Sequence, residues 1–384
     1  MAIQYVMARE VKEGMCVAQN ICDDKARILI MRGQRLGHHH IVRMRKFGIS
    51  GVFIDPDYGE KVAPPSRTEI RKLCEKVLTS SCEKLTQEFA AKKVTLDRKA
   101  ITDCTDNLVE ALMKAKKPLV TLLDIDTGSD RLMQHSVNTA VLATVLAIDL
   151  RVPEEMIKQL AVGMLFHDVG TIFFPEELMK KKTPPTAAEV CLLRRHTLLG
   201  FEHLVRSDAI SPIAANVVFR HHEMMNGTGY PEGVASNRMT TLMRIASVVE
   251  TYDSLTSPRF GIAAVLPDVA ITYIINHVNT LFAREVVLSL CKRIAIYPKG
   301  TAVQLSTGER GIVAGVLPTA PTRPIVLIQI DRTRRALKSP LIVDLSQERD
   351  YRVVRSAATI EALSREGDTA VAPVAVNPLY ATLG

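Results

Sequence analysis

The sequence predicts a mainly α-helical protein, with a small α/β unit before the helical core and a small β unit after it. Three observations support this fold class. Between about residues 67 and 294, apolar residues recur at helical spacing with few interruptions. The first 60 residues instead hold short apolar runs separated by turn residues. After about residue 298 the pattern changes to the alternation that is typical of strands.

Residues 1–63 are predicted to form the N-terminal α/β domain. Its short apolar runs have the length of strands, and a turn signal separates the first two. Two prolines and a serine at 64–66 then mark the boundary to the next segment. The expected strands are 17–21, 28–31 and 52–54, and the expected helix is 39–46.

The rest of the chain divides where the pattern changes. Residues 64–118 are expected to be linker helices, which either mediate dimerisation or are simply solvated. Residues 119–295 are the predicted helical domain, and residues 296–356 a C-terminal β subdomain. The Ala-, Thr- and Pro-rich residues 357–384 are expected to be a flexible tail. The strands expected in the β subdomain are 303–305, 312–314, 325–330 and 341–343, with a hairpin turn at Thr307–Gly308.

The composition argues against several classes of protein. No apolar run is long enough to cross a bilayer, and the first residues lack an apolar signal core, so neither a membrane span nor secretion is expected. The 7 cysteines are scattered without CxxC pairs, which favours reduced thiols in the cytoplasm. The net charge of +8 suits an anionic ligand. A nucleic-acid platform is not expected, because no long basic block appears and aromatic residues are only 5%.

Histidines and acidic residues gather in the helical domain, on or beside the apolar faces of their helices. Burying such groups without partners costs roughly 1–3 kcal/mol each, so they should need one another or a metal. Imidazole and carboxylate ligands together suit Fe, Mn or Zn. Two metals sharing Asp168 would make a hydrolytic centre in which a bridging hydroxide attacks phosphorus. The alternative is that each is an ordinary core or surface residue, which the clustering disfavours. The residues are His135, His167, Asp168, His196, His221, His222, Glu250 and Asp253.

Local signals place several of these residues at helix ends. His167 and Asp168 end a helix, with Gly170 as the expected stop. The helix of His196 begins at Thr186, where Thr186 and Glu189 form a capping box. The helix that ends at His221 and His222 starts with Ser211–Pro212.

Five stretches of this domain resemble the HD-GYP family, a branch of the HD phosphohydrolases. An HD dipeptide followed by HHE and GxGYP is highly specific. The resemblance implies an all-helical core, a metal site, and hydrolysis of cyclic di-GMP (c-di-GMP) to pGpG or GMP. The stretches are HSVNTAVLA at 135, LFHDVGT at 165, RRHTLLG at 194, HHEMMNGTGYPEG at 221 and RIASVVETYDSLTSPR at 244.

The resemblance also implies a role for each matching residue. His135, His167, Asp168 and Glu250 would hold one of two divalent metals, Fe or Mn. Asp168 would bridge to the second, held by His196, His221 and His222. His167, Asp168 and the position of Thr171 would form the catalytic group, and Gly227 and Gly229 would shape the GYP turn. The residues expected to contact substrate are Tyr230, Asp253 and Arg259.

Several residues depart from the family pattern, and a slow enzyme is one interpretation of these departures. Thr171 replaces a lysine near the scissile phosphate, and losing one such donor costs on the order of 100-fold in rate. Glu250 replaces an aspartate, Ile262 replaces a second basic substrate contact, and Asn226 replaces an aspartate in a turn. Arg131 stands where three-metal members are often acidic, which favours two metals.

These departures leave two hypotheses. The first is a slow c-di-GMP phosphodiesterase. The second is a metal-loaded c-di-GMP-binding or scaffold protein with little turnover, engaging a partner such as a diguanylate cyclase with a GGDEF domain.

Overall fold

The computed structural model describes most of the 384-residue chain. The described residues are short stretches within 4–54, then 67–89, 94–114, 131–257, 262, 264–294, 296–317 and 320–357. Contacts divide the chain into two compact units, and each is described by itself. The first unit contains Met1–Ala63, Lys299–Leu317 and Arg323–Arg355, and the second contains Pro64–Pro298, Pro318–Thr322 and Ser356–Gly384.

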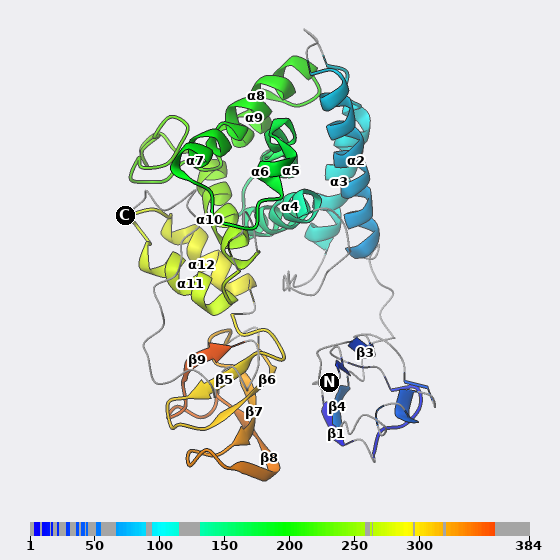
Figure 1. Cartoon of the computed structure of the whole chain (residues 1–384), viewed down its shortest axis with the longest axis vertical. Helices are drawn as coiled ribbons and strands as arrows, with labels where there is room; N and C mark the ends of the chain where they lie inside the picture. Colours follow the sequence, from blue (N-terminus) through cyan, green and yellow to red (C-terminus); the bar gives the residue numbers. More distant parts are fainter. Residues whose placement is uncertain are drawn as a thin grey trace. The chain divides into compact units, whose positions relative to one another are not determined.

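The second unit is helical, as the sequence predicts (Figure 1). The long helix α4 packs along α5, α5 packs against α9, and α10 crosses α4. The α-helices are α2 (Arg67–Gln87), α3 (Arg98–Lys114), α4 (Arg131–Asp149), α5 (Glu154–Phe166), α6 (Glu176–Met179), α7 (Ala187–Arg194), α8 (His196–Ser207), α9 (Pro212–Arg220), α10 (Thr241–Thr256), α11 (Pro267–Asn276) and α12 (Arg284–Arg293), and a 3-10 helix η2 (Val169–Phe173) follows α5.

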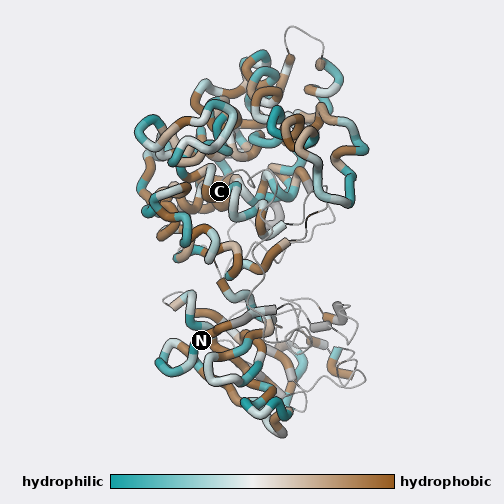
Figure 2. The backbone as a smooth tube through the Cα atoms, turned by 60° about the vertical axis from the view of Figure 1, so that its left-hand side comes forward, coloured by the Kyte–Doolittle hydropathy of each residue, from teal (hydrophilic) through white to brown (hydrophobic). Residues whose placement is uncertain are grey.

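The apolar sequence of α5 explains why this helix lies at the centre of the unit. Ile157 and every residue from Leu160 to Phe166 are buried, so the second half of α5 is apolar on all sides, as expected of a helix inside a core. Glu154 and Glu155 in the first turn match the positive end of the helix dipole. Apolar and polar stretches alternate along the helices of this unit (Figure 2), as expected where one face of each helix packs inward.

Helices α2 and α3 share the apolar core of the helical unit. Cys74, Leu78, Ile101 and Leu108 are buried in the same cluster as the residues of α4 and α5. The predicted linker helices are therefore present, and they are packed elements rather than solvated spacers. The predicted domain limits at 64 and 118 stay a prediction.

The first unit contains β-strands from both ends of the chain. Near the N-terminus, β1 (Gln4–Met7) pairs with β4 (Gly51–Ile54), and β2 (Ile21–Cys22) pairs with β3 (Ile28–Ile30). Residues 40–42 are helical, within the predicted helix 39–46. Val17, Ile30, Leu36, Met44 and Val52 are among the buried residues that form an apolar cluster here.

The C-terminal strands form one five-stranded sheet in the order β8-β7-β6-β5-β9 (Figure 1). The predicted hairpin turn joins β5 to β6, and Gly308 takes the positive φ of 99° that such a turn requires. The sequence did not predict β9 (Val353–Ala357), which lies at the boundary to the Ala-, Thr- and Pro-rich tail. The strands are β5 (Ala302–Leu305), β6 (Arg310–Gly315), β7 (Ile325–Ile330), β8 (Ala336–Asp344) and β9 (Val353–Ala357).

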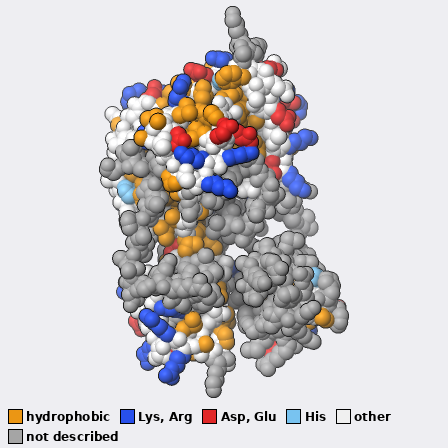
Figure 3. Space-filling view, viewed as in Figure 1, with side chains coloured by type: hydrophobic (Ala, Val, Ile, Leu, Met, Phe, Trp, Pro, Cys, Tyr) orange, Lys and Arg blue, Asp and Glu red, His pale blue; other side chains and the backbone are white. Residues whose placement is uncertain are grey.

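Charged side chains of both signs lie close together on the face of the helical unit seen in Figure 3. Pairs such as Lys158–Glu154 and Lys180–Glu176 are one helical turn apart, where opposite charges attract. Among the residues that the structure describes, no helix combines the length and apolar character needed to cross a membrane.

Candidate metal centre

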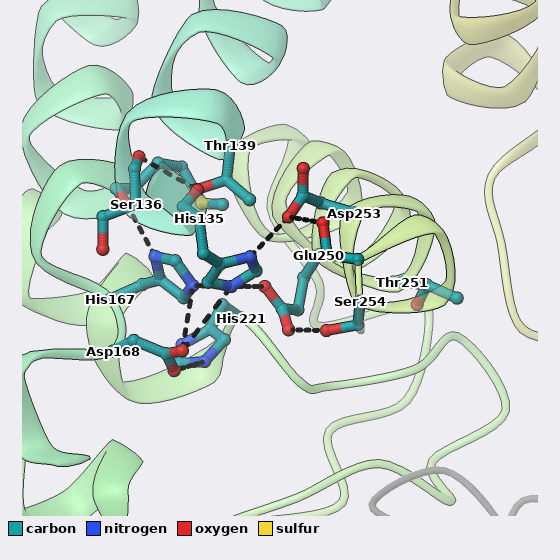
Figure 4. A network of polar contacts seen from close by, with 12 residues as sticks. His135, Ser136, Thr139, His167, Asp168, His221, Glu250, Thr251, Asp253 and Ser254 are labelled. Carbon is teal, nitrogen blue, oxygen red and sulfur yellow. Dashed lines mark hydrogen bonds and ion pairs between the residues drawn. The ribbon is translucent and has the colours of Figure 1, made fainter. Parts of the chain in front are cut away.

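The seven predicted metal ligands converge in the middle of the helical unit. They come from α4, the end of α5, the start of α8, the end of α9 and the middle of α10. Figure 4 shows His135, His167 and His221 directed toward the carboxylates of Asp168 and Glu250. None is more than 6% exposed, so bulk water has little access to them. They form two groups of donor atoms, His135 with His167 and Glu250, and Asp168 with His196, His221 and His222.

The first group is a tight triangle of donor atoms. The Nε2 atoms of His135 and His167 are 2.9 Å apart, and Glu250 Oε2 lies 2.9 Å from the first and 3.1 Å from the second. Ligands at right angles around a cation about 2.1 Å away are separated by about 3.0 Å. The triangle therefore has the size of one face of a metal coordination shell.

Asp168 faces both groups with different oxygens. Its Oδ2 lies 3.5 Å from His135 Nε2 and 3.8 Å from His167 Nε2. Its Oδ1 lies 3.2 Å from His196 Nε2 and 3.9 Å from His221 Nε2. One carboxylate with one oxygen on each side has the orientation of a bridging ligand.

Helix ends fix which ring nitrogen each histidine offers. The Nδ1 atoms of His167, His196 and His221 lie 2.6, 2.7 and 2.8 Å from the carbonyl oxygens of Met164, Leu193 and Val218. A carbonyl oxygen only accepts, so each Nδ1 must donate, and the neutral ring carries its lone pair on Nε2. His196 and His221 nevertheless have their Nε2 atoms 3.1 Å apart. Two facing lone pairs at this distance repel unless a cation lies beside them.

Burial and charge prepare these groups to bind a cation. Burial lowers the pKa of His221 well below its ordinary value, and His167 and His196 lower it further. Burial also lowers the pKa of His222. For Glu250, burial raises the pKa, but His135 and His167 outweigh it and hold the pKa well below its ordinary value. Neutral imidazoles and an ionised carboxylate are the ligand forms that metals require.

Comparison with known proteins agrees with this arrangement. A family model described as an HD domain matches residues 121–286, and a model described as a KOW domain associated with HD domain matches residues 302–364. The HD dipeptide and the GYP turn lie around one cluster of ligands within the matched residues. Residues 121–286 are therefore similar to an HD domain of the HD-GYP kind.

Three curated relatives illustrate the similarity. Cyclic di-GMP phosphodiesterase PA4108 of Pseudomonas aeruginosa is 28% identical over 223 residues, which are 57% of this chain and 52% of that protein. The cyclic di-GMP phosphodiesterase response regulator RpfG of Xanthomonas campestris pv. campestris is 28% identical over 158 residues, 41% of each chain. The 3'3'-cGAMP-specific phosphodiesterase 1 of Vibrio cholerae is 29% identical over 138 residues, 35% of this chain and 31% of that protein. The chain thus spans about half the length of the first relative and less of the others.

Gly170 brings the HD dipeptide against α8. A Cβ atom at this position would lie 2.0 Å from the carbonyl oxygen of His196 and 2.7 Å from the amide nitrogen of Gly200. The expectation that Gly170 stops the helix is wrong, because α5 already ends at Phe166 and Gly170 lies inside η2 without a positive φ. The absence of a side chain at Gly170 lets the backbone of η2 approach the backbone of α8 closely, which keeps Asp168 beside His196.

The GYP turn is anchored by a residue that the sequence analysis did not single out. The buried carboxylate of Glu223 accepts hydrogen bonds from the amides of Glu232 and Val234, each at 2.8 Å. This holds the turn against His222, whose ring stacks on Tyr230 at 4.5 Å between centroids and 21° between planes. The signal for Glu223 was its place in the HHE triplet.

The two glycines of the GYP turn have different functions. Gly227 takes the expected positive φ of 78°. Gly229 instead makes room for backbone, since a Cβ atom there would lie 2.5 Å from the carbonyl oxygen of His222. Asn226, predicted to favour a turn, accepts a hydrogen bond from the Thr228 amide at 3.1 Å.

The other predicted site residues lie in different settings. Asp253 Oδ2 is 2.6 Å from His135 Nδ1, so the structure shows it as the partner of a ligand histidine. Thr171 is buried, and its hydroxyl donates to the carbonyl oxygen of Asp168 at 2.7 Å. Tyr230 packs on His222, as described above. Arg259 and the side chain of Arg131 lie outside the described residues. Contacts of Asp253, Tyr230 and Arg259 with substrate stay predictions.

Proposed function

We propose that this HD domain is a metal-dependent phosphodiesterase that hydrolyses a phosphodiester bond of c-di-GMP to give pGpG or GMP. One observation carries the proposal. Two buried groups of histidine and carboxylate donors lie on opposite sides of Asp168, which turns one oxygen to each. Paired metal sites that share a carboxylate are suited to in-line displacement at phosphorus.

The donor atoms assign the residues to two sites. His135, His167 and Glu250 would hold one divalent metal, His196, His221 and His222 the other, and Asp168 would contribute to both. Nitrogen and oxygen donors without sulfur suit Fe, Mn or Zn, and the resemblance to the HD-GYP family favours Fe or Mn among them. When bound, the metals would supply Lewis-acid polarisation of the phosphate and activation of water.

The protein's own residues would orient the metal ligands, hold the GYP turn in place and exclude water from the site. Asp253 fixes the tautomer and direction of His135, and Ser254 donates to Glu250 Oε1 at 2.6 Å. Glu223 holds the turn that carries Tyr230. The burial of all seven ligands lowers the local dielectric and strengthens their attraction for a cation.

The substrate class is proposed from the relatives. Two of the three relatives above are named as cyclic di-GMP phosphodiesterases, and the third is named as specific for 3'3'-cGAMP. Both molecules are cyclic dinucleotides with two phosphodiester bonds. We take c-di-GMP as the substrate and 3'3'-cGAMP as the competing choice.

A binding or scaffold function with little turnover is the second candidate, and one observation favours it. At the position of the family's lysine, the Thr171 hydroxyl donates to a backbone carbonyl. It therefore brings no positive charge to a phosphate. We further expect a diguanylate cyclase as partner, a homodimer and a cytoplasmic location.

Product formation distinguishes the two candidates. The full chain is loaded anaerobically with Fe(II) or Mn(II) and incubated with c-di-GMP or 3'3'-cGAMP, and products are separated by chromatography. We expect linear pGpG or GMP from c-di-GMP, and no product with the Asp168→Ala variant. Binding of c-di-GMP without product over hours would contradict the enzyme proposal and favour the binding protein.

A further inference from the structure

Arg194 extends the stack of rings on the proposed metal site. The Tyr230 ring lies on His222, and the guanidinium carbon of Arg194 lies over the Tyr230 ring, 4.9 Å from its centroid. Tyr230 also meets His196 edge-on at 6.4 Å between centroids. A positive side chain is thus one aromatic ring away from two proposed ligands. The two separations of 4.9 and 4.5 Å limit the distance from the guanidinium carbon to the His222 ring centroid to about 9.4 Å.

Helix α7 holds Arg194 in a defined place. Thr186 and Glu189 form the predicted capping box at its start, and Glu189 also pairs with Lys181 at 2.6 Å. Arg194 is the last residue of this helix, two positions before His196. Its carbonyl accepts a hydrogen bond from the Thr197 hydroxyl at 3.2 Å. The backbone of Arg194 is therefore anchored beside the start of α8, which carries a proposed ligand.

A cyclic dinucleotide offers a second anionic group that a binding site can recognise. Its two phosphates lie on opposite sides of one macrocycle, so when one phosphate is at the metal groups the other is displaced from them by a nucleotide unit. Thr171 supplies no charge to either phosphate. Arginine suits such a contact, because its planar guanidinium binds two phosphate oxygens at once. When this plane lies over an aromatic ring, its N–H groups point outward from the edge of the stack.

We propose that Arg194 is a substrate-positioning residue that binds the non-reacting phosphate of the cyclic dinucleotide. The proposal rests on the proposed function of the site and adds a recognition contact to it. The competing explanation is that Arg194 only supports Tyr230 and, through it, His222. The two explanations predict different results. Loss of a contact to the second phosphate weakens the binding only of substrates with two phosphates, whereas displacement of His222 lowers the metal content and the activity on every substrate.

The test compares Arg194→Met with Arg194→Lys and with Arg195→Met. Arg195 is the adjacent residue, has the same charge and is exposed, so it provides a matched control. Three quantities are measured on the full chain loaded with Mn(II): the Kd of c-di-GMP, the KM and kcat for c-di-GMP, and the kcat/KM for bis(p-nitrophenyl) phosphate, which has one phosphorus. Metal content per chain is measured on every variant.

Loss of a charge-assisted contact should raise the Kd and KM for c-di-GMP about 10- to 100-fold in Arg194→Met. We expect a much smaller change in kcat, an effect on bis(p-nitrophenyl) phosphate at least tenfold smaller, and unchanged metal content. Arg194→Lys should recover part of the affinity, and Arg195→Met should match the wild type.

Two results would overturn the inference. An unchanged Kd for c-di-GMP in Arg194→Met would show that no phosphate contact exists, and loss of metal or equal losses on both substrates would show a structural role. If the wild type hydrolyses neither substrate, the proposed function fails. The Kd ratio between wild type and Arg194→Met still decides the binding role of Arg194 in that case.

Discussion

Asp253 Oδ2 lies 2.6 Å from His135 Nδ1, joining α10 to α4 directly behind a proposed metal ligand. The carboxylate accepts the Nδ1 proton, so the lone pair of the neutral ring is on Nε2, which faces Glu250 and His167. A carboxylate behind a ligand histidine fixes its tautomer and raises its basicity. Asp253 therefore acts on the site through His135.

Replacing this carboxylate should weaken metal binding without unfolding the domain. In Asp253→Asn the amide can still hydrogen-bond but carries no charge, and we expect metal affinity to fall roughly 10- to 100-fold. Competition with a metal-binding dye measures the affinity. Asp103→Asn, at an exposed position on α3, is the control and should bind metal like the wild type. Unchanged affinity in Asp253→Asn would show that its contact with His135 does not tune the site.

Gly170 should tolerate no side chain. In Gly170→Ala the new Cβ would meet the His196 carbonyl oxygen at 2.0 Å, so the backbone of η2 or α8 must shift. We expect a loss of about 1–3 kcal/mol in the free energy of unfolding, measured by urea denaturation, together with weaker metal binding.

The companion variant Gly200→Ala tests whether the close backbone approach at Gly170 causes the loss of stability expected in Gly170→Ala. Its new Cβ has no contact closer than 3.3 Å, and alanine gains about 1 kcal/mol over glycine within a helix. Near-wild-type stability is therefore expected. Equal losses in both variants would contradict the packing argument.

A salt bridge between α4 and α12 should make stability depend on acid pH. Burial raises the pKa of Asp149, but hydrogen bonds from Arg293 and Ser289 outweigh it and hold the pKa below its ordinary value of 3.8. A carboxylate with a depressed pKa stabilises the fold above its unfolded-state pKa, and this stability is lost as the pH falls through the folded-state pKa.

The Asp149→Asn variant removes this titration. Urea denaturation of both proteins at several pH values from 6 to 3 should show the wild type more stable at pH 6, with the difference shrinking below about pH 4. A constant difference over this range would mean that Asp149 does not titrate with folding.

A lysine at position 171 should raise the kcat for c-di-GMP hydrolysis. Thr171 lies three residues after Asp168 of the HD dipeptide, and its hydroxyl donates a hydrogen bond to the Asp168 carbonyl oxygen. In Thr171→Lys a positive charge near the phosphate should raise kcat on the order of 100-fold over Thr171→Met, which has an uncharged side chain of similar reach. Steady-state kinetics with c-di-GMP measure the effect. Equal kcat values would show that another step limits turnover.

Much of the site could be predicted because its signals are local. The Ser211–Pro212 start sets the helix whose end carries His221 and His222. The capping box at Thr186 starts α7, but the prediction that this helix also carries His196 is wrong, because α7 ends at Arg194 and His196 begins α8. All seven proposed ligands lie in the two groups of donor atoms. Helical periodicity likewise predicted the helical unit, and alternation predicted four of the five strands of the C-terminal sheet.

The remaining features depend on contacts between distant parts of the chain. Asp253 and His135 are 118 residues apart in sequence, so their hydrogen bond exists only once α10 crosses α4. Gly170 was interpreted as a helix stop because its real constraint, the backbone of α8, lies on another element. The packing of α2 and α3 into the helical core was missed because their charges resembled those of solvated helices.

Metal content is the most direct test of the central claim, that Asp168 joins two donor groups into one metal centre. Elemental analysis of the full chain should find about two divalent metals in the wild type and about one each in His135→Ala and His222→Ala, which damage one group. Asp168→Ala, which damages both groups, should retain almost none. A wild type without metal, or an Asp168→Ala variant with a full complement, would contradict the account.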